Sequence, residues 1–478
     1  MSTKRISFVE IMLWLLVVLF ILLAVAPFAL GFKVKSDYTK LVNQFAKNLQ
    51  VDIQIIQYDQ GVFSSEAITV LQIPDIPEKI QFKEEIIHGP LYLGLLSQGK
   101  SPLAAAVVKG QLDISTSQKE MVRKIFAGNN PLVYQSVVSF AGDVETQGYV
   151  PAINTTFEDE MGPVTIQSSG MVIHETFSAD NNMMKGEAEV PVFKINSQTL
   201  ALNAEAITLS FSGSMGSNQI IIGDSVVSFN LLDIDSGEDQ FAIRDFTLRS
   251  VTSENNALIN SGAQISAREV LASNQKFGPV SLNLSLNGLN AQSLTQIQKL
   301  QKEAENQMKE GIPPEQINAM LTGEIMGLVP ELIKEAEINI NPLSLNSELG
   351  KLEADMDFLL EGITEETPAD PMFLMSAISL ELNLSVDEPL LKQLITWQVK
   401  GGDTAGDGSE STMTDAEVSR AVDRNINDMV SESWFVLNEG VFISNVSMHQ
   451  GELLINGKPI DPMQQIMSSM GGGAPAAP

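Results

Sequence analysis

The chain has 478 residues, more than one hydrophobic core usually holds, and this length predicts two structural units or one layered body. Its 59 acidic residues outnumber 29 Lys and Arg, and the resulting formal charge of -30 argues against nucleic acid as a partner. The absence of cysteine excludes thiol nucleophiles, disulfides and zinc sites built from Cys.

The first notable element is an uncharged run at residues 11–32. As a helix it would extend about 33 Å, enough to cross the hydrocarbon layer of a bilayer. A cleaved signal peptide is the alternative, since Ala24 and Ala26 form an A-x-A pattern. Pro27 follows that cleavage point and the apolar run continues beyond it, which favours a retained anchor. We therefore expect a membrane helix within residues 1–35, with the body outside the cytoplasm.

A short helix is predicted directly after the anchor. Ser36 can cap a helix that continues to about residue 48. Leu41, Phe45 and Leu49 share one face of this helix, which predicts an amphipathic stalk beside the membrane.

Two-residue alternation of apolar and polar side chains then dominates the chain. It begins with Ile53 and Ile55 and is clearest at residues 207–212, 280–287 and 378–386. One face of each stretch is apolar and the other carries mainly hydroxyl or amide groups, which is typical of antiparallel strands covered on one side.

Helical periodicity interrupts the strands in four places. These are residues 291–309, a segment opening at Pro313 and Pro314, a shorter one after Asp387, and a helix beginning at Thr414. Thr414 and Glu417 have the spacing of a capping box. The apolar stripe of that last helix is predicted to pack in a core: Val418, Ala421, Val422, Ile426, Met429 and Val430.

These patterns predict an α+β, β-rich fold, in which a single N-terminal transmembrane helix precedes long antiparallel curved sheets with a few covering helices. The predicted regions are the anchor (1–35), a β-rich region (36–290), a helix-plus-sheet region (291–470) and a disordered tail (471–478). A polar connector at residues 401–411 is predicted to be flexible, and Met-rich residues 461–470 to pack against the body.

Residues 94–101, GLLSQGKS, match the phosphate-binding pattern G-x-x-x-x-G-K-S. That loop requires a buried parallel strand before it and a helix after it. The surrounding pattern instead predicts antiparallel strands, Leu95 and Leu96 are bulky where backbone must approach phosphate, and Pro102 lacks an N–H. We therefore interpret the match as structural and predict no nucleotide.

The sequence offers few groups for catalysis. His88, His174 and His449 each stand alone, without a second ligand at helical or strand spacing. Glu84 and Glu85 are adjacent, so in a strand they point to opposite faces, and we expect both to be solvated charges. We predict no catalytic residue, no metal ligand and no cofactor.

Three separated stretches carry a family resemblance. They are YDQGVFSSEA at residues 58–67, IIHGPLYLG at 86–94 and GELLINGKPI at 451–460. Together with the anchor, they resemble the YdgA-like family of bacterial envelope proteins, although Gln60 stands in place of a basic residue and Tyr92 in place of a second proline. The resemblance implies an inner-membrane anchor and a periplasmic body. It carries over no active-site residue, because that family has no established catalytic role.

Two hypotheses about function follow. The first is a noncatalytic, inner-membrane-anchored periplasmic protein that binds lipid or another envelope protein in an apolar β-sheet groove. The alternative is an envelope hydrolase whose site is assembled from dispersed residues. A continuous apolar groove would favour binding, whereas a cleft that joins a histidine to carboxylates would favour catalysis.

Overall fold

The computed structural model describes residues 34–40, 42–43, 46, 52–72, 79–114, 119–159, 162–218, 220–237, 240–272, 275–309, 312–363, 376–402 and 414–460. The predicted anchor, most of the polar connector, the Met-rich segment and the tail lie outside these ranges. The chain divides into two compact units, unit 1 from residues 1–215 and 225–237, and unit 2 from residues 216–224 and 238–478.

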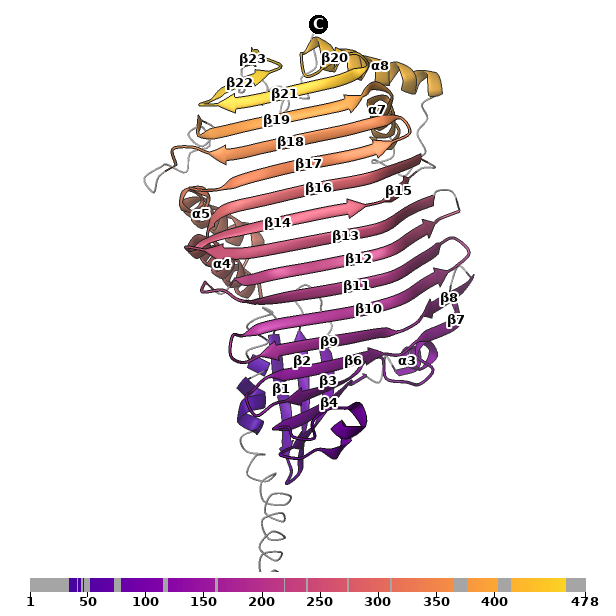
Figure 1. Cartoon of the computed structure of the whole chain (residues 1–478), viewed down its shortest axis with the longest axis vertical. Coiled ribbons are helices and arrows are strands. Elements are labelled where there is room, and N and C mark those ends of the chain that lie inside the picture. The colour runs from indigo at the N-terminus through magenta and orange to yellow at the C-terminus, as the bar shows by residue number, and fades with distance from the viewer. Residues whose placement is uncertain are drawn as a thin grey trace, which may run out of the picture. The chain divides into compact units, whose positions relative to one another are not determined.

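Unit 1 is built almost entirely from strands (Figure 1). They are β1 (Asp52–Gln60), β2 (Ser64–Gln72), β3 (Ile80–His88), β4 (Ala106–Leu112), β5 (Val133–Val138), β6 (Val144–Val150), β7 (Ile153–Asp159), β8 (Gly162–Ser168), β9 (Met171–Ser178), β10 (Met183–Asn196) and β11 (Ala201–Met215). Two short helices, η2 (Leu93–Gln98) and α3 (Lys119–Ile125), lie in its connections, and β12 (Ile221–Asp235) contributes residues to both units.

The strands of unit 1 pair antiparallel, as the alternation predicts. Hydrogen-bonded neighbours run in the order β1, β2, β3, β4, β5, β6, β9, β10, β11. The β7–β8 hairpin joins through β8 to the end of β10. Most neighbours in this order are consecutive in sequence, as antiparallel pairing allows, and the longest connections, β3–β4 and β4–β5, contain η2 and α3.

A helical segment precedes β1 and packs on unit 1. Its described residues, 34–40, 42–43 and 46, are helical. The predicted start at Ser36 is wrong, because Val34 is already helical and buried against Ile86 and Ala106 of the sheet. Burial of Val34 thus extends the helix beyond the local capping signal, whereas Leu41, Phe45 and Leu49 lie outside the described residues.

In the part of the chain that the structure describes, unit 2 contains the remaining strands and four long helices. The strands are β13 (Gln240–Asn255), β14 (Leu258–Ala267), β15 (Glu269–Ala272), β16 (Gln275–Asn290), β17 (Glu337–Ser347), β18 (Gly350–Leu360), β19 (Ile378–Asp387), β20 (Val436–Asn438), β21 (Val441–His449), β22 (Glu452–Ile455) and β23 (Lys458–Ile460). The helices are α4 (Ala291–Lys309), α5 (Pro314–Ile333), α7 (Glu388–Gly402) and α8 (Asp415–Ser431). The main antiparallel order is β13, β14, β16, β17, β18, β19, β21.

The four helices of unit 2 confirm the predicted helical segments. In α8, Val418, Val422 and Ile426 are buried in a core formed with α7 and the strands, which confirms the centre of the apolar stripe, while Val430 is 39% exposed. Glu417 accepts a hydrogen bond from the Thr414 backbone N–H at 2.8 Å, which is one half of the predicted capping box. The predicted change from strand to helix at residue 291 coincides with the first residue of α4.

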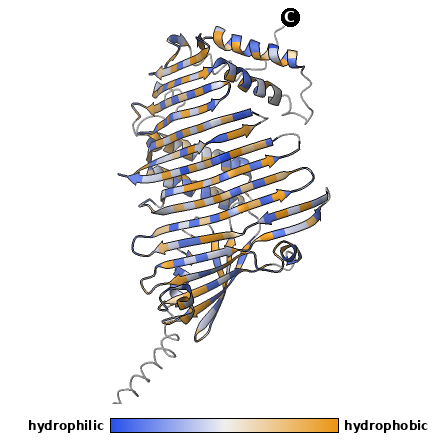
Figure 2. Cartoon of the chain, turned by 45° about the vertical axis from the view of Figure 1, so that its right-hand side comes forward, coloured by the Kyte–Doolittle hydropathy of each residue, from blue (hydrophilic) through white to orange (hydrophobic). Residues whose placement is uncertain are grey.

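Hydropathy alternates along the strands of both units (Figure 2). The apolar positions are not covered everywhere, however. In β11, Leu209 and Phe211 are 45% and 40% exposed, and in β16 Leu284 is 39% exposed. The strand pattern therefore predicts which residues share a face, but it does not predict that another layer covers that face.

Candidate functional site

The two faces of the sheet from β2 to β9 in unit 1 have different chemistry. In β3, Phe82 and Glu84 line an apolar groove on one face, whereas Lys83 and Glu85 line a polar hollow on the other. The same division continues across β4, β5, β6 and β9, because successive side chains of a strand point to opposite faces.

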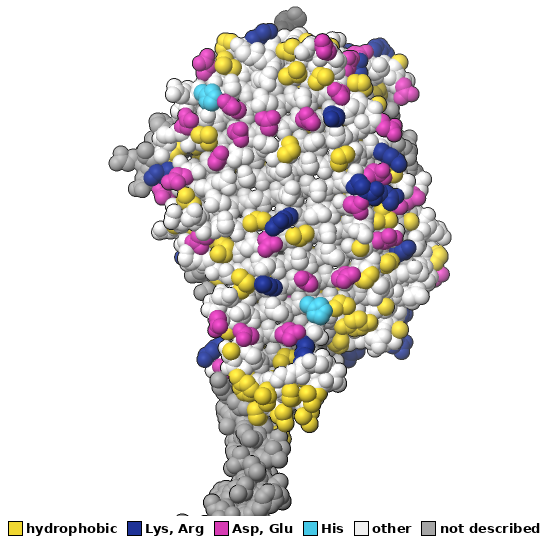
Figure 3. Space-filling view, in the orientation of Figure 1, with side chains coloured by type: hydrophobic (Ala, Val, Ile, Leu, Met, Phe, Trp, Pro, Cys, Tyr) yellow, Lys and Arg dark blue, Asp and Glu magenta, His cyan; other side chains and the backbone are white. Residues whose placement is uncertain are grey.

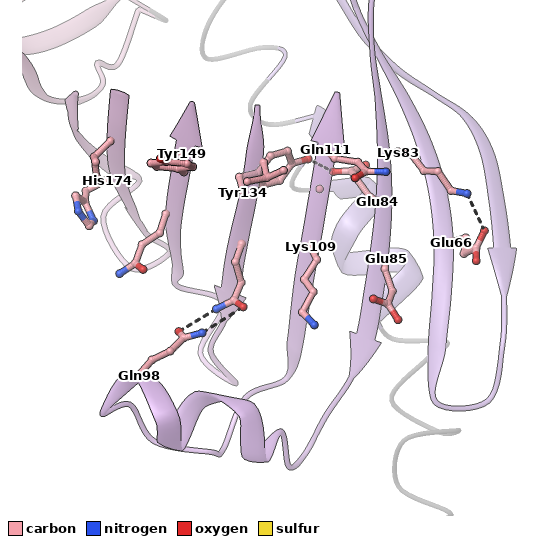
Figure 4. Close-up of a pocket in the computed structure, with 16 residues that line it drawn as sticks. Glu66, Lys83, Glu84, Glu85, Gln98, Lys109, Gln111, Tyr134, Tyr149 and His174 are labelled. Carbon is pink, nitrogen blue, oxygen red and sulfur yellow. Dashed lines mark hydrogen bonds and ion pairs between the residues drawn. The ribbon is translucent and has the colours of Figure 1, made fainter. Parts of the chain in front are cut away.

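The polar hollow has a volume of about 720 Å³ (Figure 4). Lys83 lies 3.9 Å from a Glu66 carboxylate oxygen, and Gln135 donates a hydrogen bond of 3.1 Å to Gln98. His174 and Tyr149 line one end. Because the ion pair is solvent-exposed, it contributes little to stability, and the hollow resembles an ordinary polar surface.

The apolar groove lies between the N-terminal helical segment and the other face of the sheet. It contains two cavities of about 340 and 330 Å³, which share Tyr38, Val108 and Val138. The first cavity includes Val34 and the β5–β6 loop, and the second includes the apolar side chains Val42, Ile53, Leu71, Phe82, Leu132, Val144 and Ile173.

One buried carboxylate interrupts this apolar lining. Glu84, which is 6% exposed, accepts hydrogen bonds from the hydroxyls of Tyr38, Thr69 and Tyr134. The Thr69 bond is 2.6 Å long. These bonds join the helical segment, β2, β3 and β5 through one side chain. The expectation that Glu84 is solvated is therefore wrong, although Glu84 and Glu85 do point to opposite faces as predicted.

The phenols of this network remain proton donors. Burial, followed by the negative charge of Glu84, raises the pKa of both Tyr38 and Tyr134 far above the usual tyrosine range. Each phenol can therefore supply one hydrogen bond to the carboxylate at any physiological pH. The network satisfies its own polar groups, so it demands no polar partner from a ligand.

A second carboxyl group in the groove has no such network among the residues that line the cavity. Glu175 of β9 lines the second cavity, and partial burial there raises the pKa of its carboxyl above the usual value. The residue is nevertheless exposed to solvent. An occupant of the cavity would remove that contact with water.

The three histidines lie in three different environments. His88 is buried, accepts or donates a 2.9 Å hydrogen bond with the Ser65 hydroxyl through Nε2, and contacts the Val62 carbonyl through Nδ1 at 3.2 Å. This resembles a base-activated serine, but Ser65 is only 2% exposed, so a substrate cannot reach it. His174 faces the polar hollow.

His449, at the end of β21 in unit 2, has both a hydroxyl and a carboxylate neighbour. Its Nδ1 lies 2.8 Å from the Ser379 hydroxyl, and its Nε2 lies 3.8 Å from a Glu381 oxygen. Ser379 is 7% exposed, and the Glu381 distance is longer than a hydrogen bond. No cluster of three or more His, Asp and Glu side chains in the described chain is arranged to hold a metal ion.

The phosphate-loop match at residues 94–101 has the wrong structure for its motif. It lies between two antiparallel strands, β3 and β4, and most of it forms the 3-10 helix η2, so it does not continue the preceding strand. The Lys100 amine pairs with Glu145 at 2.7 Å. Just before it, Gly89 is required by close packing, because a Cβ there would lie 2.0 Å from the Ala104 carbonyl oxygen.

The fold and the groove define a β-rich, antiparallel protein with an internal apolar site. The chain belongs to the family described as "Bacterial protein of unknown function (DUF945)", which matches residues 8–463. No curated protein and no solved structure matches it. Among the described residues, which exclude the run at 11–32, no helix is long and apolar enough to span a membrane.

Proposed function

We propose that this protein is anchored in the inner membrane by residues 11–32, has its body in the periplasm, and holds the hydrocarbon chain of a lipid in the apolar groove of unit 1 without catalysing a reaction. The YdgA-like resemblance supports the compartment. The observation that carries the binding function is the pair of neighbouring apolar cavities, whose linings share Tyr38, Val108 and Val138.

The chemistry of the groove favours hydrocarbon over a peptide. An extended peptide needs partners for its backbone N–H and C=O groups, whereas the main polar group of the groove, Glu84, is already bonded to three hydroxyls. A hydrocarbon chain needs no such partners. Burial contributes about 0.8 kcal/mol for each methylene, so eight buried methylenes would contribute about 6 kcal/mol.

Mass spectrometry of the gently solubilised full chain tests the proposal. We expect a lipid to copurify with the protein and to be retained through exchange into detergent that lacks added lipid. Protein that copurifies with no lipid and takes up none from mixed micelles would contradict the proposal.

The binding of an uncharged lipid should strengthen as the pH falls. A lipid in the second cavity displaces water from Glu175, which disfavours the charged carboxylate and therefore favours binding to the protonated form. Titration of a fluorescent diacylglycerol between about pH 7 and pH 5 should show increasing affinity. Glu175→Gln should remove most of this dependence, whereas Glu85→Gln, on the polar face, should preserve it.

The alternative, a hydrolase, is favoured most by the contacts of His449 with Ser379 and Glu381, because a carboxylate stands near this histidine. We expect a fluorophosphonate probe to leave the full chain unlabelled, because the hydroxyl of Ser379 is buried and the Glu381 carboxylate is too distant to orient the imidazole. Labelling that disappears in Ser379→Ala would establish the hydrolase instead.

A further inference from the structure

The most exposed large hydrophobic side chains of the described chain gather on one edge of unit 1. Six such side chains are more than half exposed, and five of them lie in the loops at this edge. We call it the loop edge: Phe63, Leu93, Leu96, Leu103 and Phe140, together with Val62, which is 48% exposed. Figure 3 shows hydrophobic side chains concentrated at this end of the unit.

Three connections bring these residues together. Val62 and Phe63 lie between β1 and β2, Leu93 to Leu103 between β3 and β4, and Phe140 between β5 and β6. Backbone hydrogen bonds link the connections, from His88 N to Phe63 O at 2.8 Å and from Ala105 N to Val138 O at 2.9 Å. The loop edge is therefore one surface, although it is assembled from segments far apart in sequence.

The longest connection of the loop edge carries no negative charge, although the chain is strongly acidic. No Asp or Glu occurs from residue 86 to residue 112, although the chain contains 59 of them. The charged residues in that interval are Lys100 and Lys109. Elsewhere at this edge, Asp143 ends the β5–β6 connection and Glu145 pairs with the Lys100 amine. Exposed apolar side chains with so few acids among them are unfavourable against water but suit a membrane interface.

The position of the helical segment identifies the membrane as the partner. Val34 is buried against Ile86 and Ala106, at the strand ends that carry the loop edge. Only Lys33 separates Val34 from the uncharged run at residues 11–32, so the end of that run lies within about 7 Å of Val34. A bilayer spanned by the run would meet unit 1 at this edge.

We propose that the loop edge is inserted in the interfacial layer of the bilayer that holds the anchor, which deepens the proposed function and rests on it. Phe140 belongs both to the loop edge and to the first cavity of the groove. Its insertion places the mouth of the groove at the membrane surface. A lipid chain can then pass between bilayer and groove without crossing water.

Site-specific labelling of the full chain tests this arrangement, because the natural chain has no cysteine to remove. Leu96→Cys and Phe140→Cys probe the loop edge, and Val172→Cys and Leu209→Cys are controls in unit 1 with 45% exposure at each site. Each variant is labelled with bimane and reconstituted into phosphatidylcholine vesicles that contain a lipid with a doxyl quencher near the headgroup. We expect quenching at the loop edge to exceed that at the controls by at least three-fold, while aqueous iodide shows the reverse order.

The outcomes separate this inference from the anchor and from self-association. A chain that floats with the vesicles but shows equal lipid quenching at all four sites would overturn the inference and leave the anchor intact. A chain that does not float would overturn the anchor and the inference together. Efficient crosslinking of Leu96→Cys between two copies, with no lipid quenching, would identify the loop edge as a contact between copies instead.

Discussion

Replacing Val138 with tryptophan should empty the apolar groove of lipid. Val138 lines both cavities, so a larger side chain at this position reduces the space in both. Loss of only two buried methylene contacts, at about 0.8 kcal/mol each, is enough to reduce affinity roughly ten-fold. We therefore expect at least a ten-fold decrease in the amount of lipid that copurifies with the full chain, measured by mass spectrometry.

Val133→Trp is the matched control for this experiment. Val133 lies on the same strand, β5, but lines the polar hollow on the opposite face and is 39% exposed. The Val133→Trp variant introduces the same change of side chain without reducing the volume of the groove. Circular dichroism should show that both variants keep their β structure. Equal retention of lipid by the two variants would contradict the groove as the binding site.

The sequence predicted the features that depend on local periodicity. Residues 291–309 and the segment after Asp387 are helices because their apolar side chains recur on one helical face. The observed helix α4 has the same bounds as the first of these predicted segments. The capping residues at Thr414 likewise act within four residues of one another. Antiparallel strands followed from two-residue alternation, which needs no knowledge of the partner strand.

Features that depend on distant residues could not be predicted in this way. Glu84 meets Tyr38, Thr69 and Tyr134 across 46, 15 and 50 positions of the chain. A signal was nevertheless present, because Glu84 occupies the position between Phe82 and Ile86 on the apolar face of β3. A charge at such a position requires buried partners, whereas its solvated neighbour Glu85 does not.

The exposure of the residues at the loop edge could not be predicted from local sequence either. Leu95 is fully buried while Leu96, its neighbour in the same 3-10 helix, is 56% exposed. Composition cannot separate these two leucines, since the difference arises from packing of Leu95 against Ala104 and Val107. The sequence drew attention to residues 94–101 through their match to the phosphate-binding pattern. Only the fold shows that Leu96 in this segment belongs to an exposed apolar edge.

Replacing Glu84 with alanine should detach the helical segment from the sheet and destabilise unit 1. The substitution removes the acceptor of three hydroxyls. The Tyr38 and Thr69 hydroxyls lie 2.8 Å apart and can still bond each other, whereas the Tyr134 hydroxyl loses its partner, which costs about 1–3 kcal/mol in addition to the other lost bonds. We expect the free energy of unfolding to fall by about 3–5 kcal/mol, measured by chemical denaturation of the full chain in detergent. Amide exchange at residues 34–40 should accelerate more than exchange in unit 2.

Two variants test whether the carboxylate itself is responsible. Glu85→Ala removes the adjacent, exposed carboxylate on the polar face and should change the free energy of unfolding by no more than about 0.5 kcal/mol. Glu84→Gln keeps one acceptor oxygen but places an N–H₂ donor against a hydroxyl, so its effect should be intermediate. If Glu84→Ala were no more destabilising than Glu85→Ala, the helical segment would be held by its apolar contacts alone, through Val34 and the ring of Tyr38.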